Sequence, residues 1–294
     1  MLEIGMCDAT VSEDAVVGSN VTMGKYVVIE GHAVVGDRVI LGDGVRVMGF
    51  AKIGNDVKIG AHSVISEYGS VSHRSKIGSH VHIGMGTMIG SGAKILDNAI
   101  LASGATVGVG CYIGKNTSIY KDAVVMNYSR IGNDCDIQEN SVIGVNEPSR
   151  YSICKDDGRS YGSIIGNNTS IDYRCVIEDV VVGNCVNIGR DVKISSGSVV
   201  GNHVEIEYMV SLGRRCHIGD RSTVYGKTPV ESDVVVPEDM VLSLYVTHYT
   251  ENKLVITKHN VENHLTYKYT RLERFVDRII GYIKHMRDSK HEVT

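Results

Sequence analysis

Aliphatic residues recur along the chain at every sixth position. From Val11 through Ile143, each sixth residue is Val, Ile, Leu or Met, without exception. Glycine follows most of these residues, and the position two before each is small or β-branched, as at Ala33 and Val39. Neither the helical period nor the alternation of a plain strand produces a strict period of six. The pattern therefore predicts a repeat architecture.

A coil of three short strands per turn explains this period. Each hexad supplies one strand and one corner, so 18 residues complete a turn. The aliphatic and the small residue point inward together, because alternate residues of a strand share a face. Successive coils then pair in parallel at about 4.8 Å. We predict an all-β solenoid, a parallel β-helix stabilised by contacts between neighbouring coils.

The repeat is interrupted once by a long insertion. Ile143 and Ile165 are 22 residues apart where one step needs six, which predicts an extruded loop at about residues 146–162. The hexads then resume, with a one-residue slip after Ile177. Loops of this length in compact repeats are usually functional or disordered. We expect a β-helix domain over residues 1–240.

The remaining residues, 241–294, form a C-terminal extension of different character. From about Val261 the apolar residues follow helical spacing with Lys and Arg between them, which predicts a basic amphipathic α-helix. The favoured interpretation is a cap over the open last coil. The alternative is a docking surface for an acidic carrier protein.

Composition and charge exclude several classes of partner. A net charge of −4 gives no general attraction to nucleic acid or membranes, and no signal peptide or membrane span is visible. The seven cysteines include no C-x-x-C pair, which is typical of reduced thiols in a cytoplasmic protein. Four of them fall on inward small-residue positions, namely Cys111, Cys135, Cys175 and Cys216.

The outward residue before each aliphatic can be sorted by face, since positions 18 apart share one. One face is largely apolar and is a candidate interface; it carries Val16, Val34, Lys52, Ser70, Met88, Thr106, Val124 and Val142. The next face carries Lys58, Lys76 and Lys94 on successive coils, followed by Tyr112 and Arg130. Such a ladder suits the phosphates of a nucleotide diphosphate or coenzyme A. A solvated face that promotes solubility is the equal alternative.

His73 lies at the corner between these two faces. Counting by 18 places the series Ser19, Asp37, Asn55, His73, Ser91, Val109, Asn127 and Val145 at this corner. The extruded loop leaves four coils from His73, about 19 Å away, and a folded-back loop of 16 residues reaches about 25 Å. We therefore expect the loop, the lysines and His73 to converge.

The repeated motif [LIV]-G-x-x-[small]-x, which covers about residues 11–240, resembles the repeat of the hexapeptide-repeat acyltransferases. The resemblance implies left-handed coils and a homotrimer with its coils side by side, for which the apolar face is the expected contact. The stretch VSHRSKIG, residues 71–78, resembles the phrase in which relatives acting on nucleotide-linked sugars carry a general base. It implies that His73 is that base, a role that imidazole suits near neutral pH. Arg74 stands where these relatives often have an acidic or amide residue.

A second stretch, SIIGNNTSIDYRCVIEDVVVGN, resembles the UDP-3-O-acylglucosamine N-acyltransferases. Ser196 occupies the position of their catalytic histidine, which leaves open an enzyme without a histidine base. Metal catalysis is not expected, because the one H-x-x-x-x-H pair, His259 and His264, lies outside the repeat.

Together these features predict an acyl-CoA-dependent N-acyltransferase that acts on a nucleotide-linked amino sugar, with no metal, nucleic-acid or membrane partner. His73 is the predicted base, and Asn127 in the parallel phrase NYSRIG orients the substrate. The predicted binding residues are Lys58, Lys76, Lys94, Arg130, Ser196 and, as a lid in the loop, Arg150 and Tyr151. The alternatives are a carrier-protein-dependent sugar acyltransferase, for which acyl carrier protein is the partner, and a non-catalytic β-helical scaffold subunit.

Overall fold

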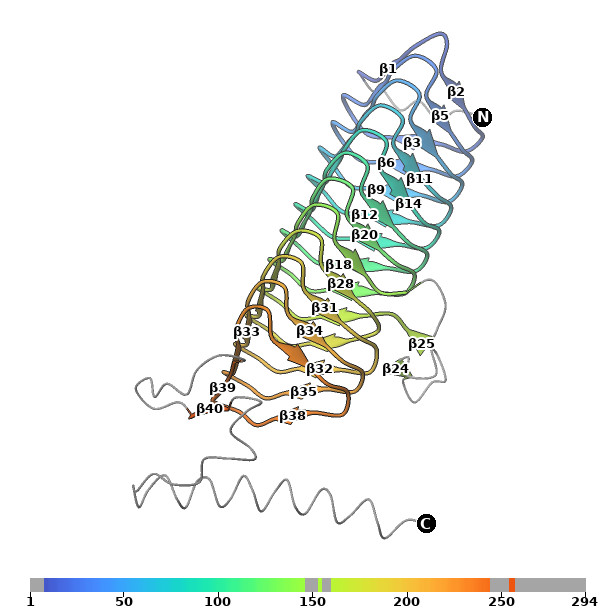
Figure 1. Cartoon of the computed structure of the whole chain (residues 1–294). Coiled ribbons are helices and arrows are strands. Elements are labelled where there is room, and N and C mark those ends of the chain that lie inside the picture. The colour runs from blue at the N-terminus through green and yellow to red at the C-terminus, as the bar shows by residue number, and fades with distance from the viewer. Residues whose placement is uncertain (1–7, 146–152, 155–159, 244–253, 257–294) are drawn as a thin grey trace, which may run out of the picture.

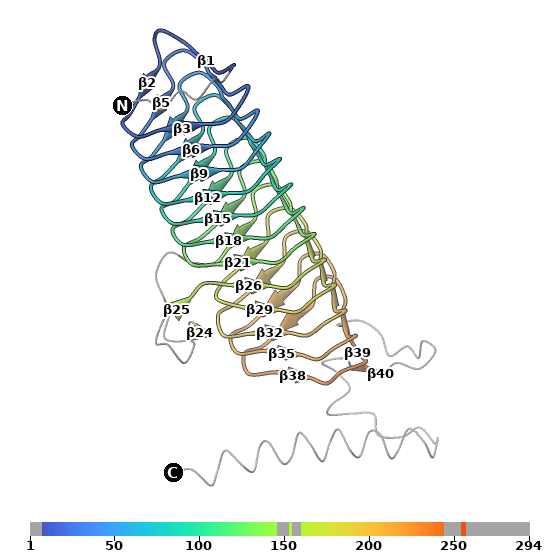
Figure 2. The same ribbon diagram turned by 180° about the vertical axis from the view of Figure 1, so that it is seen from behind.

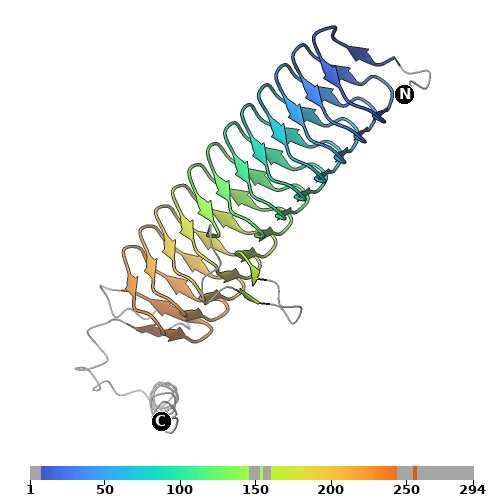
Figure 3. The ribbon, with the colours of Figure 1, turned by 90° about the vertical axis from the view of Figure 1, so that its right-hand side faces the viewer.

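The computed structural model describes residues 8–145, 153–154, 160–243 and 254–256. The chain winds into a solenoid of parallel two-residue strands, left-handed as the resemblance implied (Figures 1 and 2). Successive coils contribute strands to three flat sheets that run the length of the solenoid, as the side view in Figure 3 shows. The predicted all-β solenoid is therefore confirmed.

Each sheet collects every third strand. The apolar sheet holds β2 (Val16–Val17), β5 (Val34–Val35), β8 (Lys52–Ile53), β11 (Ser70–Val71), β14 (Met88–Ile89), β17 (Thr106–Val107), β20 (Val124–Val125), β23 (Val142–Ile143), β28 (Val176–Ile177), β31 (Lys193–Ile194), β34 (Ser211–Leu212) and β37 (Pro229–Val230). The basic sheet holds β3 (Thr22–Met23), β6 (Ile40–Leu41), β9 (Lys58–Ile59), β12 (Lys76–Ile77), β15 (Lys94–Ile95), β18 (Tyr112–Ile113), β21 (Arg130–Ile131), β26 (Ile164–Ile165), β29 (Val181–Val182), β32 (Val199–Val200), β35 (His217–Ile218) and β38 (Val235–Val236).

The third sheet has two more strands than each of the other two sheets and forms the third side of the solenoid. It holds β1 (Thr10–Val11), β4 (Val28–Ile29), β7 (Arg46–Val47), β10 (Val64–Ile65), β13 (His82–Ile83), β16 (Ile100–Leu101), β19 (Ser118–Ile119), β22 (Asp136–Ile137), β27 (Ser170–Ile171), β30 (Asn187–Ile188), β33 (Glu205–Ile206), β36 (Thr223–Val224), β39 (Met240–Leu242) and β40 (Leu254–Ile256). The last two strands extend this sheet past residue 240.

The core consists of the two inward positions of each hexad. The aliphatic Ile83 and the preceding Val81 are both fully buried, as are their equivalents in other coils. Inward hydroxyls pair with the backbone of the next coil: Ser63 Oγ donates to the carbonyl of Gly78 at 2.8 Å and accepts from the amide of Val81 at 3.0 Å. The four cysteines predicted to be core residues are buried and free, and burial raises the pKa of the Cys111 thiol to about 11.

The close approach of neighbouring coils at the corners explains the glycine that follows most of the aliphatics. A Cβ on Gly54 would lie 2.8 Å from the backbone nitrogen of His73 in the next coil, so only glycine allows this approach. The third residue after most of the aliphatics has positive φ, as at Asn20 (55°) and Arg74 (59°). The energetic cost of this backbone conformation is lowest for Gly, Asn and Asp, which occupy many of these positions.

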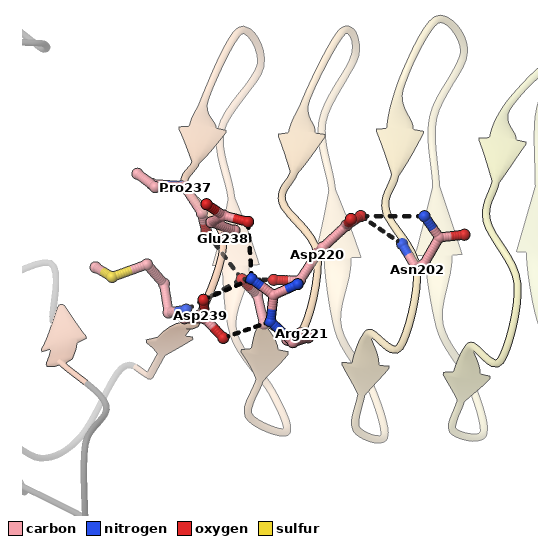
Figure 4. Close-up of polar contacts among 8 residues, drawn as sticks. Asn202, Asp220, Arg221, Pro237, Glu238 and Asp239 are labelled. Atoms are coloured by element: carbon pink, nitrogen blue, oxygen red, sulfur yellow. Dashed lines mark hydrogen bonds and ion pairs between the residues drawn. The ribbon is translucent and has the colours of Figure 1, made fainter.

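Corner side chains also join the coils to one another. The corner residue two positions after the aliphatic often accepts a hydrogen bond from the backbone amide of its counterpart one coil earlier. Asp220 Oδ1, for example, accepts a hydrogen bond from the amide of Asn202 at 2.7 Å (Figure 4). The residue after it pairs across coils: Arg221 contacts Asp239 at 2.7 Å and Glu238 at 2.8 Å. These contacts repeat with the period of the coil.

The extruded segment leaves the coil after β23 and returns at β26, as predicted. Its described part is an antiparallel pair, β24 (Ile153–Cys154) and β25 (Ser160–Tyr161), which lies beside the solenoid (Figure 1). The slip is confirmed, because Val181 follows Val176 after five residues. The predicted C-terminal helix lies outside the described residues, as do Arg150 and Tyr151 of the predicted lid. Nowhere among the described residues is there a helix whose length and hydropathy would let it cross a bilayer.

Candidate active site

The lysine ladder of the basic sheet is in register. Lys76 lies opposite Lys58 on one side and Lys94 on the other, and all three side chains are exposed. The ladder continues into Tyr112 and Arg130. The Tyr112 ring separates two cations, with Lys94 Nζ at 5.6 Å and Arg130 Cζ at 5.3 Å from its centroid. An aromatic face between cations attracts both and holds them in place.

These cations have no acidic partner among the described residues. No carboxylate there lies within 4.0 Å of the three lysines or of Arg130, whereas nearby Lys115 contacts Asp97 at 3.1 Å. Unit charges about 4 Å apart in water repel by about 1 kcal/mol, so stacked lysines oppose one another. A bound anion would relieve this repulsion, which makes the ladder a candidate phosphate site.

His73 is exposed at the corner where β11 passes into β12, and we call this corner the His73 corner. Its Nδ1 accepts a hydrogen bond from the backbone amide of Asn55 at 2.8 Å. Asn55 Oδ1 makes the same bond to the amide of Asp37 one coil earlier, at 2.9 Å. His73 thus performs the amide-capping role of its neighbours in the series. Because Nδ1 is an acceptor here, the neutral ring carries its proton on Nε2.

Asp56 supplies a negative charge close to His73. Its hydrogen bond from Arg38 lowers the pKa of the carboxyl, and the charges of Arg38, Arg74 and His73 lower it further. Asp56 is therefore ionised at neutral pH and partly balances Arg74. Asp37, Asn55 and His73 are 18 residues apart, and each has a side-chain atom that can accept a hydrogen bond. This spacing indicated the hydrogen bonds between coils, and the sequence analysis did not use it.

The structure aligns the other predicted residues with His73 but does not bring them into contact with it. Asn127 lies at the same corner three coils on, roughly 14 Å away. Its Oδ1 accepts the amide of Val109 at 2.8 Å. Ser196 is six coils from His73, roughly 29 Å, and only 8% exposed. Of the predicted set, Lys76 shares a coil with His73.

Sequence reasoning missed Ser129, which lies under the base of the extruded segment. Elsewhere an inward hydroxyl donates to the carbonyl 15 residues on, as Thr117 does to Gly132 at 2.8 Å. For Ser129 that residue is Gly144, where φ is 94° and the chain leaves the coil. Ser129 Oγ is buried and has no hydrogen-bond partner among the described residues. The break of the hexad pattern was its only sequence signal.

The described residues offer no group of three His, Cys, Asp or Glu side chains that could bind a metal ion.

Comparison with known proteins places the coil in a defined class. The sequence profile of the bacterial transferase hexapeptide (six repeats) matches residues 32–67, 74–108 and 110–144. These residues therefore carry the hexapeptide repeat that the sequence predicted. A search of curated proteins found no match.

Several solved structures are similar to parts of this chain. The UDP-N-acetylglucosamine acyltransferase of Francisella novicida is 15% identical, with 75% of this chain and 62% of that chain covered and a TM-score of 0.33. The acetyltransferase domain of PglB from Neisseria gonorrhoeae, in complex with acetyl coenzyme A, is 29% identical over 40% of this chain and 51% of that one, with a TM-score of 0.25. PerB from Caulobacter crescentus, in complex with CoA and GDP-perosamine, is 16% identical over 40% and 53%, with a TM-score of 0.24. The chain therefore spans less than two thirds of the length of each.

Proposed function

We propose that this protein is an acyltransferase that moves a short acyl group from acyl-CoA to the amine of a nucleotide-linked amino sugar. The observation that carries the proposal is the in-register ladder of unpaired cations beside the His73 corner. Acyl-CoA and a nucleotide-linked sugar both present phosphates, which Lys and Arg bind by charge-assisted hydrogen bonds. The match to the transferase hexapeptide repeat supports the same reaction class.

The reaction requires one bond exchange and one proton transfer. The amine nitrogen bonds to the thioester carbonyl carbon, the C–S bond breaks, and the proton lost by the amine ends on the thiol of coenzyme A. In this proposal His73 carries that proton. Nε2 can accept it only when the ring holds its own proton on Nδ1, so the hydrogen bond from the Asn55 amide must be released first. Asn127 and Arg130 contact more distant parts of the substrates, and Arg150 and Tyr151, which lie outside the described residues, are proposed as further binding residues.

We also propose a homotrimer that associates through the apolar sheet. The exposed fractions of Val16 and Met88 on this sheet are 60% and 56%, and exposed apolar surface of this kind marks interfaces. Sedimentation equilibrium should give three times the chain mass for the wild type and a smaller species for Met88→Glu. A monomeric wild type would refute the trimer. The buried free thiols support a cytoplasmic protein.

One observation favours the non-catalytic alternative. Both His73 and Asn127 use their acceptor atoms to cap backbone amides, which a scaffold subunit would also require. Binding of coenzyme A separates the two functions, because a scaffold has no reason to bind it. Preference for an acyl carrier protein over coenzyme A would instead identify the carrier-protein-dependent enzyme.

The decisive experiment measures free thiol released from acetyl-CoA in the presence of a panel of nucleotide-linked amino sugars. We expect thiol release with at least one member, and none with the matching nucleotide sugar that lacks the amine. Absence of turnover across the panel and of coenzyme A binding would reject the proposal.

A further inference from the structure

A hollow lies at another corner of the solenoid, where β27, β30 and β33 of the third sheet turn toward the apolar sheet. Its volume is about 360 Å³, at the lower end of the range of small-molecule sites. Gly189 forms its floor because it lacks a side chain, while Asp172 and Glu207 occupy the equivalent corner positions one coil before and one coil after it. Neither the lysine ladder nor His73 belongs to this corner.

One side of the hollow is a wall of aromatic and guanidinium groups that are held in place. Arg190 Nη1 donates to the hydroxyl of Tyr173 at 2.9 Å, and its Cζ lies 5.7 Å from the centroid of the Tyr208 ring. The Tyr208 ring lies across Gly226, where an added Cβ would be 2.8 Å from its Cε1. The hydrogen bond to Tyr173 raises the pKa of Arg190, so its guanidinium remains charged. The two rings and the guanidinium are thus ordered before any ligand binds.

The remaining lining accepts hydrogen bonds and carries negative charge. Glu207 Oε2 accepts the amide of Gly226 at 2.8 Å, and Asp172 Oδ1 accepts the amide of Tyr173 at 2.8 Å, so each carboxylate keeps a second oxygen. Glu205 and Asn187 lie side by side in register and are both exposed at the rim. Within the part of the chain that the structure describes, no cation lies within 4.0 Å of Asp172, Glu205 or Glu207. The three carboxylates outnumber Arg190 and Lys227, whose Nζ lies 5.9 Å from the centroid of the Tyr208 ring, so the hollow favours a cation.

We propose that this hollow binds a hydroxylated ring that bears a protonated amine, the chemistry of a free hexosamine. The ammonium and hydroxyl groups donate to the free carboxylate oxygens, and the ring lies against the exposed edge of Tyr208, whose faces are covered by Arg190 and Gly226. Arg190 and Asn187 donate to ring and hydroxyl oxygens. The site is separate from the proposed active site and does not depend on the proposed function.

The test is calorimetric titration of the full chain with glucosamine, glucose and glucose 6-phosphate. We expect glucosamine to bind at least about tenfold more tightly than glucose, a difference of about 1.4 kcal/mol, and glucose 6-phosphate to bind no better than glucose. Glu205→Gln should weaken glucosamine binding about tenfold. Equal affinity for glucosamine and glucose, or no binding at millimolar concentration, would overturn the proposal.

Two further variants locate the binding. Glu67→Gln is the matched control, since Glu67 is an exposed carboxylate at the same corner in a distant coil, and it should leave the affinity unchanged. The triple variant Lys58→Met, Lys76→Met, Lys94→Met should also leave it unchanged. If the triple variant weakens glucosamine binding and Glu205→Gln does not, the sugar binds at the ladder through its hydroxyl groups and the hollow is not a site. Tyr208→Leu, checked by its melting temperature, should weaken binding without unfolding the coil.

Discussion

His73 and Asn55 are joined across neighbouring coils by a hydrogen bond in which the Asn55 backbone amide donates to His73 Nδ1 at 2.8 Å. The same side chain is thus the proposed base and a structural cap. Asn55 performs the capping role with an amide oxygen, so asparagine can replace histidine in one role and not in the other.

We therefore predict different outcomes for two substitutions of His73. His73→Asn should keep the cap and the melting temperature, while His73→Ala should lose about 1 kcal/mol of stability. Both should lower the rate of thiol release by about a hundredfold or more if His73 transfers a proton. Thermal unfolding and the thiol assay measure the two effects. Full activity in His73→Asn would show that His73 is only a cap.

The ladder predicts a salt-sensitive affinity for phosphate ligands. Lys76→Met should weaken coenzyme A binding about fivefold to thirtyfold, because a charge-assisted bond contributes about 1–2 kcal/mol. The affinity of the variant should also fall less steeply with added salt. Titration at two ionic strengths measures both. Lys115→Met is the control, since Lys115 already pairs with Asp97; an equal loss in this variant would contradict a specific role for the ladder.

Two glycines should respond oppositely to substitution. Gly54→Ala places a Cβ 2.8 Å from the His73 backbone nitrogen and should cost about 2 kcal/mol or more. Gly86 has φ of 66° with nothing within 4 Å of its Cβ, so Gly86→Asn should change stability by less than about 0.5 kcal/mol. Urea denaturation midpoints compare the two. A tolerated Gly54→Ala would refute close coil packing as the reason for the glycine.

Acid should destabilise the solenoid through its corner carboxylates. The Ser19 amide and hydroxyl lower the pKa of Asp37, and the amide of Asn202 lowers that of Asp220, both below the ordinary 3.8. Because the folded state favours the charged forms, this stabilisation is present above the unfolded pKa and is lost as pH falls through the lower folded values. The melting temperature should be nearly constant from about pH 7 to 5 and fall below about pH 4. Asp37→Asn keeps the hydrogen-bond acceptor and should reduce the dependence of the melting temperature on pH. An unchanged pH profile in this variant would argue against Asp37 as a source of the acid sensitivity.

The hexad pattern by itself determined the solenoid, its strands, its corners and the point where the extruded segment leaves. This was possible because each coil packs only on its neighbours, so a local period of six specifies the whole fold. It also placed His73 and Asn127 at one corner, with the number of coils between them, and the structure adds Ser196 to the same corner.

Only the tertiary structure decided which outward side chains find partners. Lys115 reaches Asp97 while Lys76 reaches no described carboxylate, and His73 turns Nδ1 toward Asn55. The hollow at Gly189 likewise arises from side chains on three coils. Register places residues on a face, but side-chain torsions and neighbouring coils determine each contact, and the hexad pattern does not encode them.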